Sequence, residues 1–400
     1  MNILLLCNKP PWPPLEGGPI AMNAMVKGLQ NAGHSVKILS VNSNKYNVKP
    51  GDIPDDYKKS TGIELVYIDL SLKPLPAFIR LVKNESYHIS RFISRDFETA
   101  LTRILTAEKF DVIQFETLYT TPYINHIRSL SDARLVLRAH NIEHLIWKRI
   151  ARGETNPLRK WYINKLSRTL ENYEKSVLDR LDGVVAITGK DANYFRSSKP
   201  GLAVIDIPFG IDAATDNSTM TVEPTRGFKL FHLGSMNWMP NQEGIKWFLN
   251  EVWPDLHTRY PELTFSLAGR AMPQWLCKLQ MPGVFVDGEV PDALAYMQQH
   301  DAMIVPLFSG SGIRIKIIEG MLAGKTIITT PVGAEGINFT PGKELLIAND
   351  APGFVRAIEM LIAKPIAYQE IGCHARELVL KEHNNALLME KLTNFYSSLA

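Results

Sequence analysis

The chain has 400 residues, a net charge of +3 and ordinary shares of apolar and charged residues. This length exceeds what one typical hydrophobic core holds, so we expect two domains in a soluble, globular protein. Positive and negative charges nearly balance, and the chain has no run of Lys or Arg that could bind the phosphate backbone of a nucleic acid. Nucleic acid is therefore not expected as a partner.

The three cysteines, Cys7, Cys277 and Cys373, are isolated from one another. They form neither a disulfide framework nor a metal motif, which favours a reducing compartment and predicts no metal site. The apolar N-terminus has no basic region before it and stops at Pro10-Pro11, so it predicts a buried strand and not a signal peptide. No stretch approaches the ~18 apolar residues of a membrane-spanning helix.

Short apolar runs alternate with amphipathic segments through the first half, a pattern that predicts a parallel sheet covered by helices. A loop rich in Pro and Gly follows the first run, and a helix ending near Gly33 follows that loop. The loop therefore lies at the carboxyl end of the first strand, where open α/β sheets bind ligands. The predicted strands are Asn2–Leu6, Ser35–Val41, Glu64–Ile68, Phe110–Phe115, Ala133–Ala139, Gly183–Ile187 and Leu202–Ile207.

The same alternation restarts after a polar stretch without periodicity, residues 211–226, which we interpret as a linker. We therefore predict two Rossmann-like domains, residues 1–210 and 227–382, facing each other across a cleft, with a terminal helix in 383–400 that crosses back to the first domain. The last two helices are predicted over Pro365–Glu382 and Asn385–Leu399. The predicted strands of the second half are Phe228–Leu233, Leu263–Ala268, Val284–Asp287, Ala302–Leu307, Thr326–Thr329 and Leu345–Ala348.

A glycine-rich loop follows the strand that ends near Phe308 and leads into a helix predicted to begin near Gly312 or Ile313. Helix N-termini carry unpaired N–H groups and the positive end of the helix dipole, so they favour anions. Arg314 and Lys316 add two cations where the dipole would favour acids. This combination predicts a bound anion such as a phosphate.

Glu319 follows about two turns later, roughly 10 Å from the predicted helix start. A carboxylate at that distance could accept hydrogen bonds from sugar hydroxyls while the helix N-terminus holds phosphates. Ile315, Ile318 and Leu322 are expected to face the core. The alternative is a plain amphipathic helix in which Lys316 and Glu319 form a weak surface pair.

Residues 147–168 combine cations with large rings on what the pattern predicts as one stretch of helix, from Trp147 to Arg168. Such a segment is typical of a helix that lies on an anionic membrane surface. It is equally typical of a long solvated helix, since Glu171 and Glu174 follow it.

Several motifs in their order along the chain resemble the family 4 retaining glycosyltransferases, which have the two-domain GT-B fold. The resemblance covers nearly the whole chain, and its motifs are weak singly but specific together. They are Glu16-Gly-Gly18, Arg138-Ala-His-Asn-Ile-Glu143, Ile207-Pro-Phe-Gly-Ile-Asp212, Phe231-His-Leu-Gly-Ser-Met-Asn-Trp-Met-Pro-Asn241, Ser309–Ala323 and Thr330-Pro-Val-Gly-Ala-Glu-Gly-Ile337.

The resemblance implies roles for individual positions. Glu319 matches the acid that holds the donor ribose, Gly17 and Gly18 match the glycines near the donor phosphates or the acceptor, and His140 matches a histidine that approaches the transferred sugar. An alternative for His140 is a structural histidine that satisfies a strand end. The other residues expected at the donor are Gly234, Ser235, Gly310, Ser311, Gly312 and Ile313.

Two features depart from the family's pattern. Ser311 stands where an acid usually contacts the donor sugar, eight residues before Glu319, and the segment Gly234–Glu243 lacks the usual cations. Arg314 and Lys316 are expected to replace those cations, because a diphosphate needs neutralising in a partly dry site. The expected mechanism is electrostatic stabilisation of the leaving nucleoside diphosphate, without a metal or other cofactor.

The function implied is retaining transfer of a sugar from a nucleotide-sugar donor to a glycan, lipid-linked or other cell-envelope acceptor, in the cytoplasm or at the inner face of its membrane. One alternative is a nucleotide-sugar 2-epimerase of the same fold; another, motivated by Ser311, is a non-catalytic nucleotide-sugar-binding protein. A nicotinamide-dependent oxidoreductase is disfavoured, because Asn8-Lys-Pro-Pro follows the first strand in place of a Gly-x-Gly-x-x-Gly turn.

Overall fold

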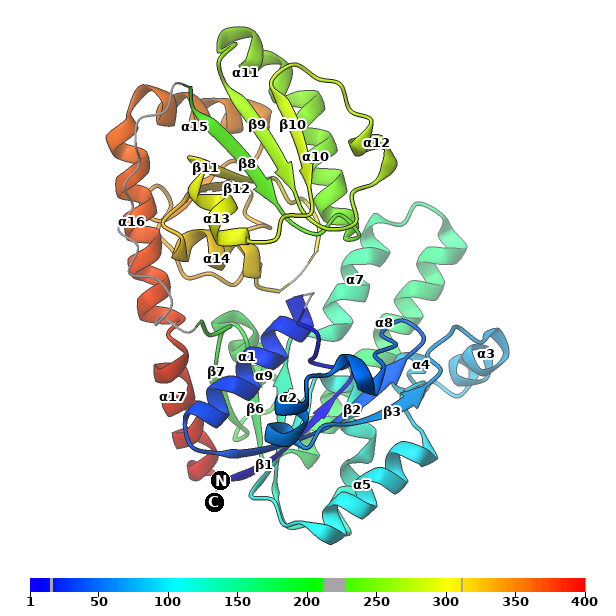
Figure 1. The fold of residues 1–400 in the computed structure, drawn as a ribbon. Coiled ribbons are helices and arrows are strands. Elements are labelled where there is room, and N and C mark those ends of the chain that lie inside the picture. Colours follow the sequence, from blue (N-terminus) through cyan, green and yellow to red (C-terminus); the bar gives the residue numbers. More distant parts are fainter. Residues whose placement is uncertain (15–16, 212–226, 311, 400) are drawn as a thin grey trace. The chain divides into compact units, whose positions relative to one another are not determined.

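The computed structural model describes residues 1–14, 17–211, 227–310 and 312–399. The chain divides into two compact units, Met1–Ile211 with Asn385–Ala400, and Asp212–Asn384; each is built on one parallel sheet (Figure 1). From residue 212 on, the predicted linker lies outside the described residues. In the described part of the chain, no helix is both long and apolar enough to cross a bilayer.

The sheet of the first unit has seven parallel strands in the order β3-β2-β1-β4-β5-β6-β7. Strand order therefore reverses beside β1, between β2 on one side and β4 on the other, and this reversal marks the usual ligand crevice of an open α/β sheet. The strands are β1 (Asn2–Cys7), β2 (Ser35–Ser43), β3 (Glu64–Ile68), β4 (Val112–Glu116), β5 (Arg134–Ala139), β6 (Gly183–Ala186) and β7 (Ala203–Asp206).

Helices cover both faces of this sheet. The helices are α1 (Gly17–Asn31), α2 (Asp55–Thr61), α3 (Pro74–Val82), α4 (Tyr87–Ser90), α5 (Arg95–Ala107), α6 (Ile124–Arg128), α7 (Glu143–Gly153), α8 (Pro157–Val177), α9 (Gly189–Ser198) and α17 (Asn385–Ser398), with 3₁₀ turns η1 (Pro50–Asp52), η2 (Leu118–Tyr123) and η3 (Leu178–Arg180).

Strand β1 shows why the sheet needs cover on both sides. Its side chains alternate between two separate cores: Leu4 and Leu6 pack with the cluster under α5 and η2, and Ile3, Leu5 and Cys7 pack with the cluster under α1 and α17. All five are fully buried. Burial of an aliphatic side chain of this size contributes about 1.5–3 kcal/mol, so neither face of the strand can be left in water.

The second unit repeats the pattern with six parallel strands in the order β10-β9-β8-β11-β12-β13. Its strands are β8 (Lys229–Leu233), β9 (Thr264–Ala268), β10 (Val284–Gly288), β11 (Ala302–Val305), β12 (Thr326–Thr329) and β13 (Leu346–Ile347). Its helices are α10 (Met239–Glu251), α11 (Trp253–Arg259), α12 (Gln274–Cys277), α13 (Ala293–Gln298), α14 (Ile315–Leu322), α15 (Ala351–Ala363) and α16 (Pro365–Glu382).

Every predicted strand is present, with ends that differ by no more than two residues. The prediction of one helix through residues 147–168 is wrong, because α7 ends at Gly153 and α8 begins at Pro157. Pro157 cannot donate to a preceding turn, and the Asn156 side chain caps α8 by accepting from the N–H groups of Leu158 and Arg159.

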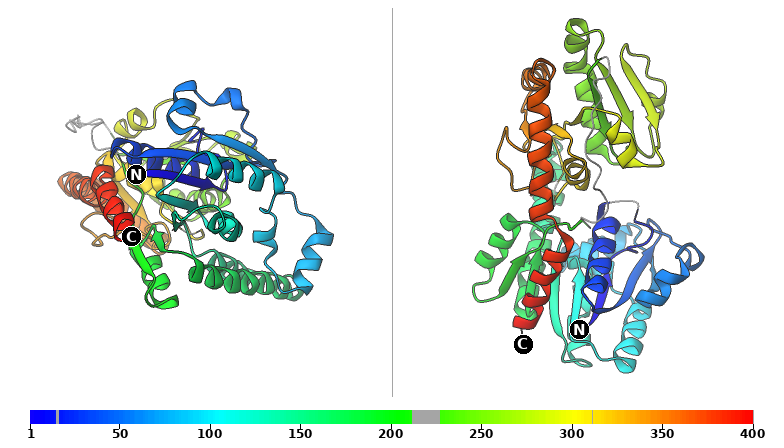
Figure 2. Two further views of the ribbon diagram at one scale, coloured as in Figure 1. Left: turned by 90° about the horizontal axis from the view of Figure 1, so that it is seen from below. Right: turned by 60° about the vertical axis from the view of Figure 1, so that its left-hand side comes forward.

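The C-terminal helix α17 belongs to the first unit, where it packs against α1 (Figure 2). The chain leaves this unit at Ile211 and returns to it at Asn385, and the Asn385 N–H donates to the Ile211 carbonyl at 3.0 Å. Gly28 on α1 permits close approach, since a Cβ there would lie 2.8 Å from both Asn385 Oδ1 and Met389 Cγ.

We expect Gly28→Ala to destabilise the first unit by about 1–3 kcal/mol, because the added methyl overpacks the contact between α1 and α17. The matched control is Gly189→Ala, also on a helix of this unit, where an added Cβ meets nothing within 4 Å. Thermal unfolding of both variants checks this. Equal melting temperatures for the two would contradict the close packing of α17 on α1.

Candidate functional site

The predicted anion site of the second unit lies where β11 runs through a glycine loop into α14. Gly310 and Gly312 have positive φ angles of 108° and 79°, and Arg314 is extended with φ −91° and ψ 94°. The predicted helix start at Gly312 or Ile313 is therefore wrong: α14 begins at Ile315, and Arg314 is its N-cap. Ser311 lies outside the described residues.

The later start changes which residues face the core. Ile317, Ile318 and Met321 are fully buried, whereas Ile315 and Leu322, which we expected in the core, are half-buried. Glu319 is exposed. It lies about 6 Å along the axis from the first helical residue, nearer than the predicted separation.

Lys316 is held in a pocket of polar atoms from the loop after β8. Its Nζ donates to Asn241 Oδ1 at 2.5 Å and lies 3.5 Å from His232 Nε2. A Cβ on Gly234 would lie 2.8 Å from this Nζ. Gly234 is therefore needed at this position, because any larger residue would displace the ammonium group.

The tautomer of His232 follows from its two neighbours. Its Nδ1 lies 2.8 Å from the Ile304 carbonyl, which can only accept, so Nδ1 carries the hydrogen and Nε2 presents a lone pair to Lys316. Burial, and then the charge of Lys316, hold the pKa of His232 well below its ordinary range, so it stays neutral. Burial, and then Arg314, lower the pKa of Lys316 to about 7.

Arg314 brings the second cation to the same place. It is only 5% exposed, its Nη1 donates to the Gly312 carbonyl at 2.7 Å, and its guanidinium lies 5.3 Å over the ring of Trp238. A Cβ on Gly310 would lie 2.8 Å from the Trp238 ring. The glycine therefore lets the loop after β11 approach the loop after β8. Half-buried Ile313 lies between Gly312 and Arg314.

Ser235 completes the loop after β8. Its carbonyl accepts from Asn241 Nδ2 at 2.7 Å, and its hydroxyl donates to Asn237 Oδ1 at 2.8 Å. The structure thus brings Gly234, Ser235, Arg314 and Lys316 together at the N-terminus of α14, whose first turn holds no acid. Two cationic side chains beside a helix N-terminus whose first turn holds no acid are features that favour an anion.

Three residues of this site were not assigned roles from the sequence: His232, Trp238 and Asn241. All three lie in the segment 231–241 that carried the family resemblance. The signal was therefore present. The spacing of these three residues indicates no chemistry by itself. Lys316 reaches His232 and Asn241, and Arg314 reaches Trp238, only when the start of α14 packs against the loop after β8.

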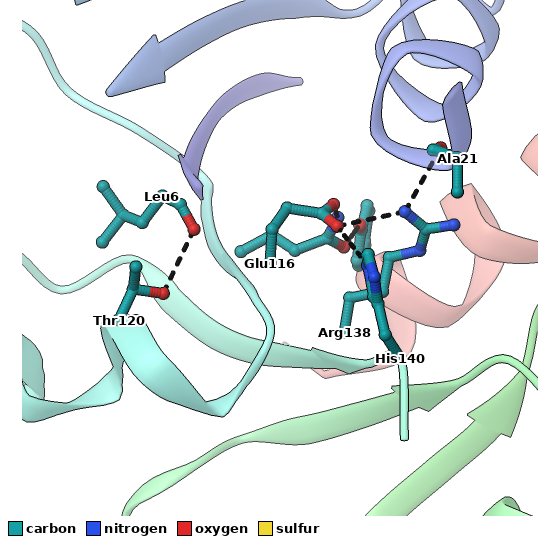
Figure 3. A network of polar contacts seen from close by, with 8 residues as sticks. Leu6, Ala21, Glu116, Thr120, Arg138 and His140 are labelled. Atoms are coloured by element: carbon teal, nitrogen blue, oxygen red, sulfur yellow. Dashed lines mark hydrogen bonds and ion pairs between the residues drawn. The ribbon is translucent and has the colours of Figure 1, made fainter. Parts of the chain in front are cut away.

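The first unit carries His140 directly after β5, which pairs with β4 at the strand-order reversal. Figure 3 shows the His140 side chain beside Glu116 and Arg138. Its Nε2 lies 2.8 Å from the carboxylate of Glu116, the last residue of β4, and Arg138 Nη1 donates to the same oxygen at 3.1 Å. Glu116 is completely buried. Burial opposes its ionisation, but Arg138 and the His140 hydrogen bond lower the pKa of Glu116 to about 2.

Gly17 and Gly18 open α1, at the same edge of the sheet. Gly18 leaves room for Lys9, because a Cβ there would lie 2.7 Å from the Lys9 ammonium. Lys9 Nζ also lies 4.8 Å above the Tyr46 ring. Lys9 is thus a cation near the helix N-terminus that sequence reasoning passed over, although it lies only two residues after the first strand.

Glu143 is the first residue of α7 and is buried. It accepts from the Tyr119 hydroxyl at 2.8 Å, and its N–H donates to Glu174 at 3.1 Å. Burial, with a smaller contribution from Glu174, raises the pKa of Glu143 to about 7. Within the described residues, no group of three His, Cys, Asp or Glu side chains has the arrangement of a metal site.

Comparison with known proteins gives one family match. Residues 227–364 match the family "Glycosyl transferases group 1", and this segment holds all residues of the candidate anion site in the second unit. A protein of Klebsiella pneumoniae, "Uncharacterized 44.6 kDa protein in cps region", is 19% identical over 397 residues, which covers 96% of this chain and 97% of that protein.

Solved structures match the chain over its full length. Sucrose-phosphate synthase from Thermosynechococcus elongatus has a TM-score of 0.68 at 15% identity, covering 100% of this chain and 99% of its own. Anabaena HepE in complex with UDP has a TM-score of 0.67 at 14% identity and covers 100% of both chains. The lipopolysaccharide outer core galactosyltransferase WaaB has a TM-score of 0.64 at 13% identity and also covers 100% of both.

The fold is GT-B. This confirms the predicted fold class, two α/β units with Rossmann-like parallel sheets. Together with the family match, these structures support a glycosyltransferase.

We expect Lys316→Met to stabilise the ligand-free protein. Between pH 7 and the ordinary Lys pKa of 10.5, the unfolded chain binds a proton that folded Lys316 lacks, so the free energy of unfolding rises with pH across this window. Below about pH 7 the folded protein carries the full penalty. At ~1.4 kcal/mol per pKa unit, the shift from 10.5 to about 7 sets an upper bound of about 5 kcal/mol. Because Lys316→Met also removes the hydrogen bond to Asn241, the net gain should be about 1–3 kcal/mol.

Thermal unfolding at neutral pH and at about pH 9.5 measures this effect, which should shrink at the higher pH. Lys246→Met on α10 is the control, because Lys246 is exposed. A Lys316→Met protein that melts at a lower temperature than the parent at neutral pH would contradict the buried-charge assignment.

Proposed function

We propose that this protein is a retaining glycosyltransferase that transfers a sugar from a nucleoside-diphosphate sugar. The observation that carries the proposal is the pair of cations at the N-terminus of α14, where Arg314 is buried and Lys316 is held by Asn241 and His232. Placing these charges there is unfavourable in the free protein, because α14 has its positive dipole end at the same point. A bound diphosphate would offset the burial of these two charges and their repulsion by the helix dipole.

The chemistry follows from where charge develops. When the bond between the anomeric carbon and the phosphate oxygen breaks, negative charge grows on the departing diphosphate. Arg314, Lys316 and the N–H groups that begin α14 are preorganised donors for this charge, the type of stabilisation that commonly dominates catalysis. Burial lowers the pKa of Lys316 to about 7 in the ligand-free protein, and it also strengthens the attraction between the ammonium and a bound phosphate, because charges attract more strongly out of water.

Glu319, Gly17, Gly18 and His140 receive the remaining roles. Glu319 is exposed on α14 and accepts hydrogen bonds from the donor ribose; Gly17 and Gly18 let a ligand approach the start of α1. His140 contacts the transferred sugar. In this proposal the acceptor hydroxyl attacks from the side of the leaving group, the departing diphosphate takes its proton, and no metal or other cofactor takes part.

The donor nucleotide we propose is UDP. Support comes from Anabaena HepE, a structural neighbour whose complexes contain UDP and UDP-glucose. A thermal-shift panel of UDP-, GDP-, ADP- and dTDP-sugars tests this directly, because a ligand present at 100 times its Kd stabilises by about 2.7 kcal/mol. Donor binding without transfer or hydrolysis across an acceptor panel would favour a non-catalytic nucleotide-sugar-binding protein instead.

We expect Lys316→Ala to lower kcat by about 10²–10³-fold, the range seen when one preorganised transition-state donor is removed. Melting temperature should not fall, since the replaced charge costs stability. Lys246→Ala serves as the control, an exposed lysine on α10. The assay is release of nucleoside diphosphate from the donor found in the thermal-shift panel, and a normal kcat for Lys316→Ala would exclude the phosphate assignment.

A membrane-facing acceptor is the second part of the proposal. Residues 147–168 hold seven Lys and Arg against one acid, Glu154. The α7–α8 surface also exposes large apolar side chains: Leu158 is 80% exposed and Trp161 62%. Trp147, by contrast, stacks on His88 with ring centroids 4.2 Å apart, so it does not belong to this surface.

Helix α3 adds a second apolar surface nearby in the first unit. Leu75 and Val82 are 70% and 68% exposed, α4 contacts both α3 and α8, and Lys165 donates to Asn84 just beyond α3. Exposed apolar side chains flanked by cations favour an anionic lipid surface. This supports an acceptor that is lipid-linked or part of the cell envelope, at the inner face of the cytoplasmic membrane.

We expect the double variant Leu158→Ser with Trp161→Ser to bind phosphatidylglycerol vesicles at least ~10-fold more weakly than the parent, because both side chains would enter the interface. The control is Phe285→Ser with Ile366→Ser, two exposed apolar residues of the second unit. Vesicle sedimentation measures binding. Equal binding by both double variants would remove the α7–α8 surface from the proposal.

A further inference from the structure

Glu116 is the centre of a buried hydrogen-bond chain that reaches beyond His140 (Figure 3). One of its carboxylate oxygens accepts from Arg138 Nη1 at 3.1 Å and from His140 Nε2 at 2.8 Å. The other accepts from Gln114 Nε2 at 2.7 Å. Glu116 and Gln114 are both completely buried, so no solvent competes for these bonds.

The protonation of each group follows from its partners. Glu116 is ionised and can only accept, so His140 must carry its hydrogen on Nε2. Burial lowers the pKa of His140, which is therefore neutral, with a lone pair on Nδ1. Nδ1 has no hydrogen-bond partner among the described residues, and the side chain is 13% exposed. Nδ1 is the atom left to accept from a substrate hydroxyl.

The orientation of Gln114 is set in the same way. Its Nε2 must face Glu116, because the amide oxygen in that place would meet a carboxylate oxygen, and two acceptors cannot form a hydrogen bond. Gln114 Oε1 then faces the Tyr396 hydroxyl, which donates to it. Tyr396 is buried and lies on α17, the C-terminal helix that rejoins the first unit.

We propose that Tyr396 and Gln114 are positioning residues through which the C-terminal helix holds His140 in the tautomer with the hydrogen on Nε2. This inference rests on the role of His140 in the proposed function. Arg138 supplies the charge that keeps Glu116 ionised, and Gln114 fixes the rotation of the carboxylate about its axis. Without Tyr396, the Gln114 amide can rotate, and the carboxylate loses the fixed donor to its other oxygen.

The direct test is the ¹⁵N spectrum of the His140 imidazole in Tyr396→Phe, with the signal assigned by its loss in His140→Ala. The parent should show one neutral tautomer with a protonated Nε2. Tyr396→Phe should show exchange between tautomers and a kcat lower by about 10-fold, as small misplacements of a reacting group produce. KM for the donor should change less than kcat, because the phosphate site belongs to the other unit and stays intact.

Tyr123→Phe is the matched control. Tyr123 is buried in the same unit; its hydroxyl donates to the Phe92 carbonyl at 2.7 Å and accepts from the Ser94 N–H at 2.9 Å. The variant therefore loses buried hydrogen bonds of a tyrosine hydroxyl without touching the chain to His140. Gln114→Met is the second variant, which removes the amide at similar volume and should give the same ¹⁵N signature as Tyr396→Phe.

The outcomes separate this inference from the proposed function. Unchanged His140 signals in both Tyr396→Phe and Gln114→Met would overturn the positioning chain. Altered signals with a normal kcat would leave the chain intact and refute the role of His140 in transfer. Altered signals with a kcat reduced in both variants, but not in Tyr123→Phe, support both.

Discussion

Both units depend on one constraint: a fully parallel sheet must be covered by helices on both faces, so polar chemistry can gather only at its edges. In the first unit, β1 sends alternate side chains into two separate cores. Polar side chains follow directly where the strands end, as Glu116 ends β4 and His140 follows β5. The carboxyl edges then hold loops, helix N-termini and buried charged groups such as Glu116.

The two units differ in how the charged groups at these edges are compensated. Glu116 is buried with its countercharge, Arg138, and two further donors, so the ionised form is favoured. Lys316 is near another cation and has only neutral partners, so its charged form is disfavoured. A satisfied network is rigid and orients a neighbouring group, whereas an uncompensated cation stores a free-energy cost that a bound anion can relieve. The first arrangement suits positioning and the second suits binding.

The site illustrates what local patterns can predict. Arg314 and Lys316 were identified because two cations beside glycines at a helix start are anomalous within the sequence alone. The exact helix start was wrong by two or three residues, since positive φ angles at Gly310 and Gly312 extend the loop. His232 and Asn241 were missed because a histidine within a strand and an asparagine in a helix are common, and only the approach of Lys316 gives them a function.

The amino-acid sequence by itself determined the alternation of strands and helices, the two-unit organisation and the position of the glycine loop, because these depend on hydrophobic periodicity and on backbone preferences that act over a few residues. Tertiary structure decided which distant groups meet. Tyr396 lies 282 residues from Gln114, and Lys316 lies 84 from His232. No local signal encodes such pairs, since they arise only when separate strands and helices pack into one core.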